Sequence, residues 1–267
     1  MTDQPPPTQS QYALDVSQLS AGYPGNNRAI DDLNFVIHKG ERVALIGPNG
    51  AGKTTLFKAI AGLIPFTDGE ISVYGEDCRS SHNFVGYVPQ NSEIDWDFPV
   101  NVTDVVMMGR ARQSRWLPWA KAADRDRVHT LLAQLNLSSL AKRQIGELSG
   151  GQKRRVFIAR ALAQEANILL MDEPFNGVDG AAEDTIMETL NFLTDQGITL
   201  LLATHDMARA ARDFDRIMLL KRRLIAYGAP DDVMNPAALQ QAYGGAMRIF
   251  NDGQATIFIA DEHGTGH

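Results

Sequence analysis

The sequence is poor in cysteine, since Cys78 is the only one among 267 residues. A single thiol cannot form an internal disulfide bond, and a chain of this kind suits a reducing cytoplasm. We therefore expect Cys78 to be a small buried hydrophobic residue and not a nucleophile.

The sequence also lacks a long apolar run. No stretch approaches the roughly 18 consecutive apolar residues that a membrane-spanning helix requires. The first seven residues, Met1 to Pro7, contain neither the basic start nor the apolar segment of a secretory signal. We therefore expect a soluble protein that is not exported by that route.

Positive charge is scarce as well, because the net charge is −7 and the sequence pI is near 5.4. Surfaces that bind nucleic acid carry an excess of lysine and arginine, so DNA and RNA are poor candidates as partners. The densest basic run, residues 153–155, would spread around a helix. We interpret this run as a solvated or interface patch.

What the chain does contain is a glycine-rich loop between an apolar run at 42–46 and a helix-like segment at 55–60. The loop fits G-x-x-x-x-G-K-[ST], in which glycines let backbone N–H groups converge on phosphates. Lys53 would reach the β- and γ-phosphates, and the Thr54 hydroxyl would bind the accompanying Mg²⁺. The expected nucleotide-binding residues here are Gly47, Asn49, Gly50, Ala51, Gly52, Lys53, Thr54 and Thr55.

A pair of carboxylates, Asp172 and Glu173, follows the apolar run at 168–171. That run predicts a buried strand of a parallel sheet, whose C-terminal edge is where such folds place their sites. A buried charge is unfavourable unless a cation or substrate binds it, although one carboxylate alone would more often be a helix cap. Asp172 suits Mg²⁺, and Glu173 suits the polarisation of a water that attacks the γ-phosphate.

Two further polar residues follow strand-like segments. His205 follows the apolar run at 198–203, where its imidazole could contact the γ-phosphate or the attacking water. A lone histidine at a strand end is more often structural. Gln90 follows the segment at 86–88, and its amide could contact both the metal and the attacking water.

The segment Leu148-Ser149-Gly150-Gly151-Gln152 lies between the phosphate loop and the carboxylate pair. Ser149 is a candidate N-cap of the helix predicted at 149–163, and a helix N-terminus attracts anions. Periodicity also predicts strands at 12–16, 33–38, 70–74 and 256–260, helices at 102–110, 124–135, 230–234 and 236–242, and a hairpin of 217–220 with 224–227.

These motifs, in this order and spacing over about residues 12–235, resemble the nucleotide-binding subunit of an ABC transporter. The resemblance implies that Tyr23 stacks on adenine. It implies that Ser149, Gly150, Gly151 and Gln152 cap the γ-phosphate of ATP bound to an opposing subunit. It also implies that Asp179 lies in a loop that crosses between two sites, and that ATP and Mg²⁺ are the ligands.

A narrower resemblance, to the ATPase subunits of bacterial manganese, iron and zinc importers, rests on four strings. They are residues 95–100, 107–110, 173–179 and 242–245. Asn101 and Asn176 depart from the pattern of that group, which often has Thr and Ala there. At this stage neither position is expected to do chemistry.

The resemblance implies an α/β fold with a P-loop NTPase core, a mainly parallel sheet, an antiparallel β subdomain and an inserted helical subdomain at about 95–163. The expected divisions are a disordered lead-in at 1–10, the ABC ATPase domain at 11–245 and a partly disordered extension at 246–267. It further implies a homodimer in the ATP-bound state. Its partners would be integral membrane permease subunits and, indirectly, an extracytoplasmic solute-binding protein, at the cytoplasmic face of the inner membrane.

Other readings stay open. A soluble ABC ATPase for cofactor assembly or DNA repair is the first alternative. The negative net charge argues against DNA as a partner, and the lack of a long heptad insertion argues against the repair type. A nucleotide sensor without turnover is disfavoured by Lys53, Glu173 and His205. Trp96 and Phe98 fit a docking groove and a helical-lobe core equally well. His263 and His267 are too sparse to form a metal site.

Overall fold

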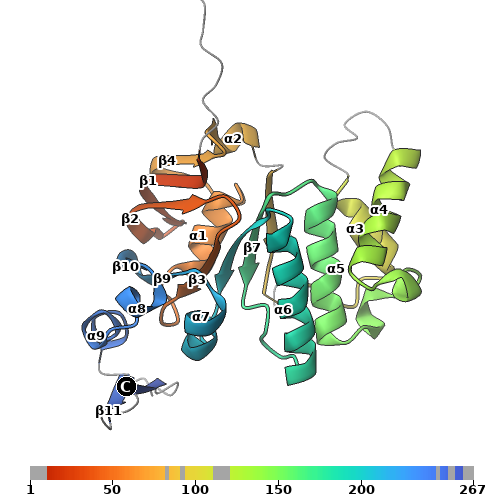
Figure 1. Ribbon diagram of the computed structural model, residues 1–267. Coiled ribbons are helices and arrows are strands. Elements are labelled where there is room, and N and C mark those ends of the chain that lie inside the picture. Colours follow the sequence, from red (N-terminus) through yellow and green to blue (C-terminus); the bar gives the residue numbers. More distant parts are fainter. Residues whose placement is uncertain are drawn as a thin grey trace, which may run out of the picture.

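The computed structural model describes residues 11–81, 84–90, 94–110, 121–244, 247–251 and 256–260. Its described elements form two main β-sheets with helix α1 between them, a separate group of helices beside the larger sheet, and a small two-stranded sheet near the C-terminus (Figure 1). The lead-in expected at 1–10 and the tail that contains His263 and His267 lie outside the described residues.

The larger sheet has six strands in the order β10-β9-β3-β8-β7-β6. They are β3 (Arg42–Ile46), β6 (Val85–Val88), β7 (Ile168–Asp172), β8 (Thr199–Ala203), β9 (Arg216–Lys221) and β10 (Arg223–Gly228). All neighbours are parallel except β10 and β9, which form the predicted hairpin. The sheet thus confirms the predicted mainly parallel core.

Both faces of this sheet are buried, and that explains its apolar strands. In β3, Val43 and Leu45 join one hydrophobic cluster, whereas Ala44 and Ile46 join the other. Because successive side chains of a strand point to opposite faces, each strand must be apolar at every position. The polar residues of the site therefore lie at the last residue of a strand, as Asp172 does in β7, or after the strands end.

The smaller sheet is antiparallel, as predicted, with the order β2-β1-β4-β5. Its strands are β1 (Tyr12–Tyr23), β2 (Asn26–His38), β4 (Phe66–Val73) and β5 (Glu76–Asp77). Helix α1 (Lys53–Ile60) buries Leu56, Phe57 and Ile60 in the core that the two sheets share. Cys78, which begins the short helix α2 (Cys78–Ser81), is buried as expected.

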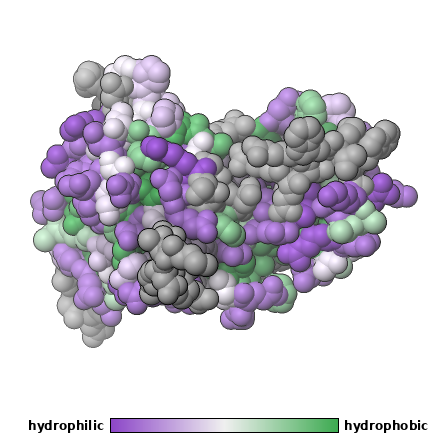
Figure 2. All heavy atoms as spheres, turned by 90° about the horizontal axis from the view of Figure 1, so that it is seen from above, coloured by the Kyte–Doolittle hydropathy of each residue, from purple (hydrophilic) through white to green (hydrophobic). Residues whose placement is uncertain are grey.

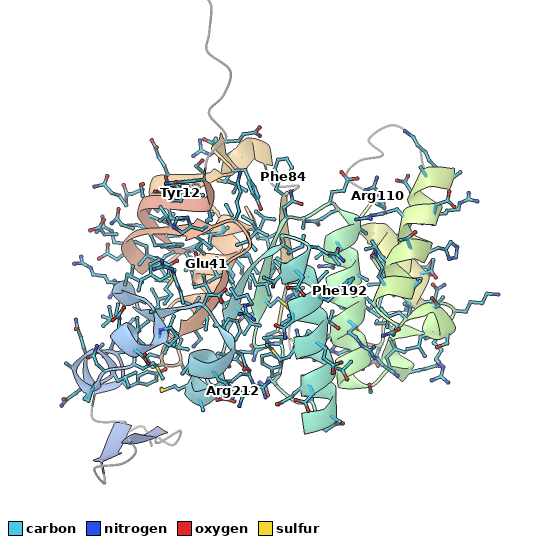
Figure 3. The ribbon with its side chains drawn as sticks, viewed as in Figure 1. Tyr12, Glu41, Phe84, Arg110, Phe192 and Arg212 are labelled. Carbon is cyan, nitrogen blue, oxygen red and sulfur yellow. The ribbon has the colours of Figure 1, made fainter. Side chains whose placement is uncertain are left out.

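The helical lobe comprises α3 (Val102–Met108), α4 (Ala122–Gln134), α5 (Gly150–Ala163) and the 3₁₀ helices at Ser138–Leu140 and Ile145–Glu147. Arg110 donates to Asp124 Oδ1 and to the Ala163 carbonyl, both at 2.8 Å, and so joins three of these helices (Figure 3). A Cβ on Gly109 would lie 2.2 Å from the Arg160 carbonyl oxygen. The string at 107–110 is therefore a packing motif of the lobe.

Sequence analysis did not predict α6 (Gly180–Asp195), α7 (Met207–Asp213) or the short α2. The buried residues of α6, Ile186, Leu190 and Leu193, do follow helical spacing, so the signal was present. The helices α8 (Pro230–Val233) and α9 (Pro236–Tyr243) agree with prediction.

The strand predicted at 256–260 is present as β12 (Thr256–Ala260). It pairs antiparallel with β11 (Met247–Asn251), a strand that was not predicted. A single strand has unpaired backbone groups, and the second strand satisfies them.

Within the part of the chain that the structure describes, no helix has the length and apolar character to cross a bilayer. The face seen from above is mostly hydrophilic where the structure places its residues (Figure 2).

Candidate functional site

The phosphate loop joins β3 to α1. At two of its glycines, neighbouring atoms lie too close to leave room for a side chain. Gly52 is the N-cap of α1 with φ of 100°, and a Cβ there would lie 2.4 Å from Ile30 Cγ2. At Gly47 a Cβ would lie 2.2 Å from the Leu220 carbonyl oxygen. The loop therefore presents backbone at the start of α1, where the first N–H groups have no partner within the helix.

Lys53 is folded into this loop. Its Nζ donates to the Gly47 carbonyl at 2.7 Å and to the Pro48 carbonyl at 3.2 Å. Burial lowers the pKa of Lys53, and the nearby carboxylates Glu173 and Asp172 act in the opposite direction. A cationic group is thus held by two loop carbonyls next to the free N–H groups at the start of α1, and charge and N–H donors together suit a polyphosphate.

Thr54 and Asp172 form a pair of oxygen ligands. The Thr54 hydroxyl donates to Asp172 Oδ2 at 2.6 Å, although 118 residues separate them. Asp172 closes β7 and is 3% exposed. Hydroxyl and carboxylate oxygens are the ligands that Mg²⁺ prefers, so these two residues fit the magnesium site that sequence analysis assigned to them.

Glu173 lies one residue beyond β7 in a left-handed backbone conformation, with φ of 47°. Non-glycine residues adopt this region rarely, and such strained positions cluster at functional sites. Its Oε2 accepts from Gln90 Nε2 at 3.1 Å and from Asn176 Nδ2 at 3.2 Å. Asn176, which sequence analysis set aside as a departure from the family pattern, therefore contacts the candidate base directly.

A cavity of about 770 Å³ unites these groups, a size suited to a small-molecule ligand. Its lining residues are Tyr23, Ala29, Asn49, Gly50, Ala51, Gly52, Lys53, Thr54, Thr55, Gln90, Asp172, Glu173, Asn176 and His205. The structure thus brings together the predicted phosphate loop, the carboxylate pair, Gln90, Tyr23 and His205. Ala29 and Asn176 were not predicted, and no sequence signal singles them out.

Tyr23 and His205 border the cavity from two directions. Tyr23 ends β1 and is 40% exposed, so its ring is accessible to a flat ligand. His205 follows β8 and is also exposed. Its backbone is fixed by its neighbours, since the Thr204 hydroxyl accepts a hydrogen bond from the Asp206 N–H at 3.0 Å.

Six predicted residues do not line this cavity: Gly47, whose carbonyl accepts from Lys53, and the more distant set Ser149, Gly150, Gly151, Gln152 and Asp179. Ser149 is the N-cap of α5, and it forms a reciprocal capping box with Gln152. Asp179 caps α6 by accepting from the Ala182 N–H at 2.8 Å. A Cβ on Gly151 would lie 2.8 Å from Ala182 Cβ, so glycine allows α5 to approach α6 closely.

The interpretation of residues 153–155 as a solvated patch is wrong for Arg154, which is 2% exposed. Three consecutive residues on a helix point in different directions, and the middle one here faces the sheet. Lys153 instead lies over the Trp96 ring, 4.7 Å from its centroid. The patch is therefore divided between surface and core.

Trp96 and Phe98 fitted a docking groove and a helical-lobe core equally well, and the structure places the two residues differently. Trp96 packs edge-on against Phe157, with 5.5 Å between ring centroids, and belongs to the core of the lobe. Phe98 is 54% exposed. Of the two, Trp96 is partly buried against the lobe and Phe98 is the more exposed.

Comparison with known proteins agrees with this geometry. Residues 30–176 match the family model described as ABC transporter. The chain is 45% identical over 241 residues to the manganese transport system ATP-binding protein MntB of Bacillus subtilis, covering 90% of this chain and 96% of that protein. It is 43% identical to the zinc transport system ATP-binding protein TroB of Treponema pallidum, covering 88% of each.

Solved structures show the same likeness. A metal-chelate type ABC transporter in an inward-facing conformation superposes with a TM-score of 0.78 at 29% identity, over 93% of this chain and 97% of that one. The ADP conformation of an ATP-binding cassette of an ABC transporter gives a TM-score of 0.74 at 25% identity, over 88% and 100%. The chain belongs to the ABC transporter family, as an ATP-binding ATPase domain of the fold that the sequence predicted.

Proposed function

We propose that this protein is the ATP-hydrolysing subunit of an importer for a transition-metal ion, namely manganese, iron or zinc. The observation that carries the proposal is the convergence of Lys53, Thr54, Asp172 and Glu173 on one cavity from two separate parts of the chain. The cargo is inferred from relatives whose names specify manganese, zinc and chelated iron transport. The subunit assignment follows from the family to which the chain belongs.

The predicted residues that line the cavity have proposed roles in nucleotide binding and hydrolysis. The backbone of residues 49–54 and Lys53 bind the β- and γ-phosphates, and Tyr23 stacks on adenine. Thr54, Asp172 and Gln90 would hold Mg²⁺, which when bound neutralises phosphate charge. Glu173 accepts the proton of the attacking water, while His205 and Gln90 orient that water and the γ-phosphate. Water attacks the γ-phosphorus, and ADP leaves.

The signature residues Ser149 to Gln152 are proposed to act on a second copy of the chain. They begin a helix outside the cavity of their own chain, and a helix N-terminus favours an anion. Two copies would then sandwich two ATP molecules, with Asp179 in the loop between the sites. Closure on binding and reopening after hydrolysis would move the membrane subunits.

The multi-component systems of the relatives imply membrane permease partners, and we place the dimer against them at the cytoplasmic face of the inner membrane. An extracytoplasmic solute-binding protein would deliver the cargo. Among the described residues, no group of three or more His, Cys, Asp or Glu side chains is arranged to hold a metal ion. Selectivity for the cargo is therefore assigned to the partner chains.

The domain division that we propose keeps residues 11–245 as the ATPase domain, with the helical subdomain at about 95–163. The 246–267 segment is treated as an extension whose described part is the β11–β12 hairpin.

Uptake of radiolabelled manganese, zinc and iron tests the proposal. A strain that lacks this subunit should lose uptake of one of them and regain it with the parent gene but not with Glu173→Gln. Uptake of all three at the parental rate without the subunit would contradict metal import. If only a metal chelate is affected, the cargo is that chelate.

A soluble ABC ATPase for cofactor assembly or repair is the alternative function. Co-purification separates the two, because an importer subunit should be recovered with a polytopic membrane protein from detergent extracts. Recovery with cytoplasmic assembly proteins alone would favour the alternative.

A further inference from the structure

Arg154 is a buried cation whose hydrogen bonds in the described structure all end on main-chain carbonyls. Its Nη1 donates to Pro89 O at 2.8 Å, its Nη2 to Glu173 O at 3.2 Å and its Nε to Pro174 O at 3.2 Å. Burial lowers its pKa to about 10, while Asp172 and Glu173 oppose that change. A buried charge is unfavourable unless its N–H groups form hydrogen bonds. Here the planar guanidinium donates to the carbonyls of three residues.

The three acceptors lie at the two strand ends that carry the proposed catalytic groups. Pro89 directly precedes Gln90, beyond β6, and Glu173 and Pro174 follow β7. The side chains of Gln90 and Glu173 hydrogen-bond each other at 3.1 Å. Arg154 therefore holds two backbone segments in place from outside the cavity. The side chains of those segments meet inside it.

The hydrogen bond from Arg154 to the Glu173 carbonyl bears on the backbone conformation of Glu173. Glu173 has a left-handed φ of 47°, a conformation that persists in a non-glycine residue only where the surroundings hold it. Arg154 helps to hold this conformation, because it donates hydrogen bonds to the carbonyls of Glu173 and of Pro174, the next residue. The Glu173 N–H also donates to the Ala203 carbonyl and the Glu173 carbonyl also accepts from the Asn176 N–H, so the guanidinium adds to a main-chain hold that these bonds begin.

The helix that carries Arg154 is also the helix that begins at the signature segment. Ser149 caps α5, and Arg154 lies in its second turn. One rigid helix thus connects the segment proposed to face the partner's ATP with the backbone beneath Glu173.

We infer that Arg154 is a positioning residue: it sets Glu173 and Gln90 in hydrolytic geometry and ties that geometry to the orientation of the signature helix. The inference rests on the proposed roles of Glu173 and of the signature segment. Arg154 itself does not line the cavity, so it acts through the two backbone segments.

The test compares Arg154→Gln, Arg154→Lys and a matched control, Arg160→Gln. Arg160 lies on the same helix, its pKa is also lowered by burial, and it donates to the Tyr87 carbonyl of β6 at 3.3 Å. Within the described part of the chain, its side-chain hydrogen bond ends on β6 and not on the residues that follow β7. All proteins are normalised to ATP-binding sites titrated with a fluorescent ATP analogue, and melting temperatures are recorded.

For Arg154→Gln, kcat per titrated site should fall about 10- to 100-fold, because the catalytic groups would be misplaced. The ATP dissociation constant should change less than about threefold. Arg154→Lys should recover part of kcat, because it keeps the charge but not the fork. Arg160→Gln should lower the melting temperature and leave kcat per site unchanged. Equal kcat losses in Arg154→Gln and Arg160→Gln, or parental kcat in Arg154→Gln, would overturn the inference.

A double variant separates this inference from the proposed role of Glu173. If Arg154 acts through Glu173, adding Arg154→Gln to Glu173→Gln should reduce turnover further by much less than it does alone. Parental turnover in Glu173→Gln alone would refute the role of Glu173. Low turnover in Glu173→Gln, with a full additional loss in the double variant, would refute only the coupling through Arg154.

Discussion

The nucleotide cavity and the signature segment are built in opposite ways. The cavity gathers side chains from β1, the phosphate loop and the ends of β6, β7 and β8 within one chain. The signature segment, by contrast, uses its polar groups locally, in the Ser149–Gln152 capping box at the start of α5. The difference teaches that one chain brings the nucleotide-binding groups together, whereas its signature segment lies outside that cavity, which is why we propose that the segment acts on a second copy.

The two regions also hold their residues by different means. The cavity depends on convergence over long sequence distances, such as Thr54 with Asp172 and Gln90 with Glu173. The signature segment depends on close packing, because Gly151 meets Ala182 of α6. Substitutions in the cavity should therefore affect nucleotide chemistry, and those in the signature segment should affect association.

Glu173→Gln should have the largest effect on the cavity. The amide keeps the shape of the carboxylate but cannot accept a proton, so turnover should fall by at least about 10²-fold, as is typical when a general base is lost. ATP binding should persist and a closed dimer should accumulate, which size-exclusion chromatography with ATP detects. Hydrolysis at the parental rate would show that Glu173 has another role.

Lys53→Ala should act on binding instead. Hydrogen bonds to charged groups contribute about 1.5–3 kcal/mol, so ATP affinity should weaken about 10- to 100-fold. Calorimetric titration of the purified protein measures this directly. Unchanged affinity would contradict the assignment of Lys53 to the phosphates.

Ser149→Arg should separate the two regions. The bulky cation should prevent ATP-dependent dimerisation, with ATP binding by the monomer changed less than about threefold, because the phosphate loop supplies most donors within one chain. Mixing this variant with Lys53→Ala creates one composite site with both halves intact. Partial recovery of ATPase activity in the mixture is expected.

The trans-capping role of Ser149 depends on that comparison. A Ser149→Arg protein that still dimerises with ATP and hydrolyses at the parental rate would refute it.

Asn176→Ala should have the smallest effect. The variant removes one of two amide donors to Glu173 Oε2 and leaves Gln90 in place, so kcat should change by no more than about threefold. Asn101→Thr is the matched control, because Asn101 is the other departure from the family pattern and caps α3 far from the cavity. Both variants are measured by steady-state ATPase assay.

A loss in Asn176→Ala as large as that in Glu173→Gln would show that Asn176 is essential to the reaction. Identical kinetics in Asn176→Ala and Asn101→Thr would show that the observed hydrogen bond has no kinetic consequence.

The sequence by itself determined the features whose physical requirements are local. The phosphate loop needs glycines next to a strand and a helix, and the buried strands β7 and β8 need unbroken apolar runs. The capping role of Ser149 also depends only on residues three positions away. Each of these was predicted because neighbours in the chain supply the interaction.

Only the tertiary structure decided how distant segments meet. The run at 153–155 gives no sign of which cation is buried, since that depends on the carbonyls at 89, 173 and 174 that surround Arg154. Gln90 likewise meets Glu173 only because β6 and β7 are neighbours in the sheet, although 83 residues separate the two side chains. The physical reason is that burial and hydrogen-bond partners are set by packing between elements, and the spacing of residues along one element does not encode them.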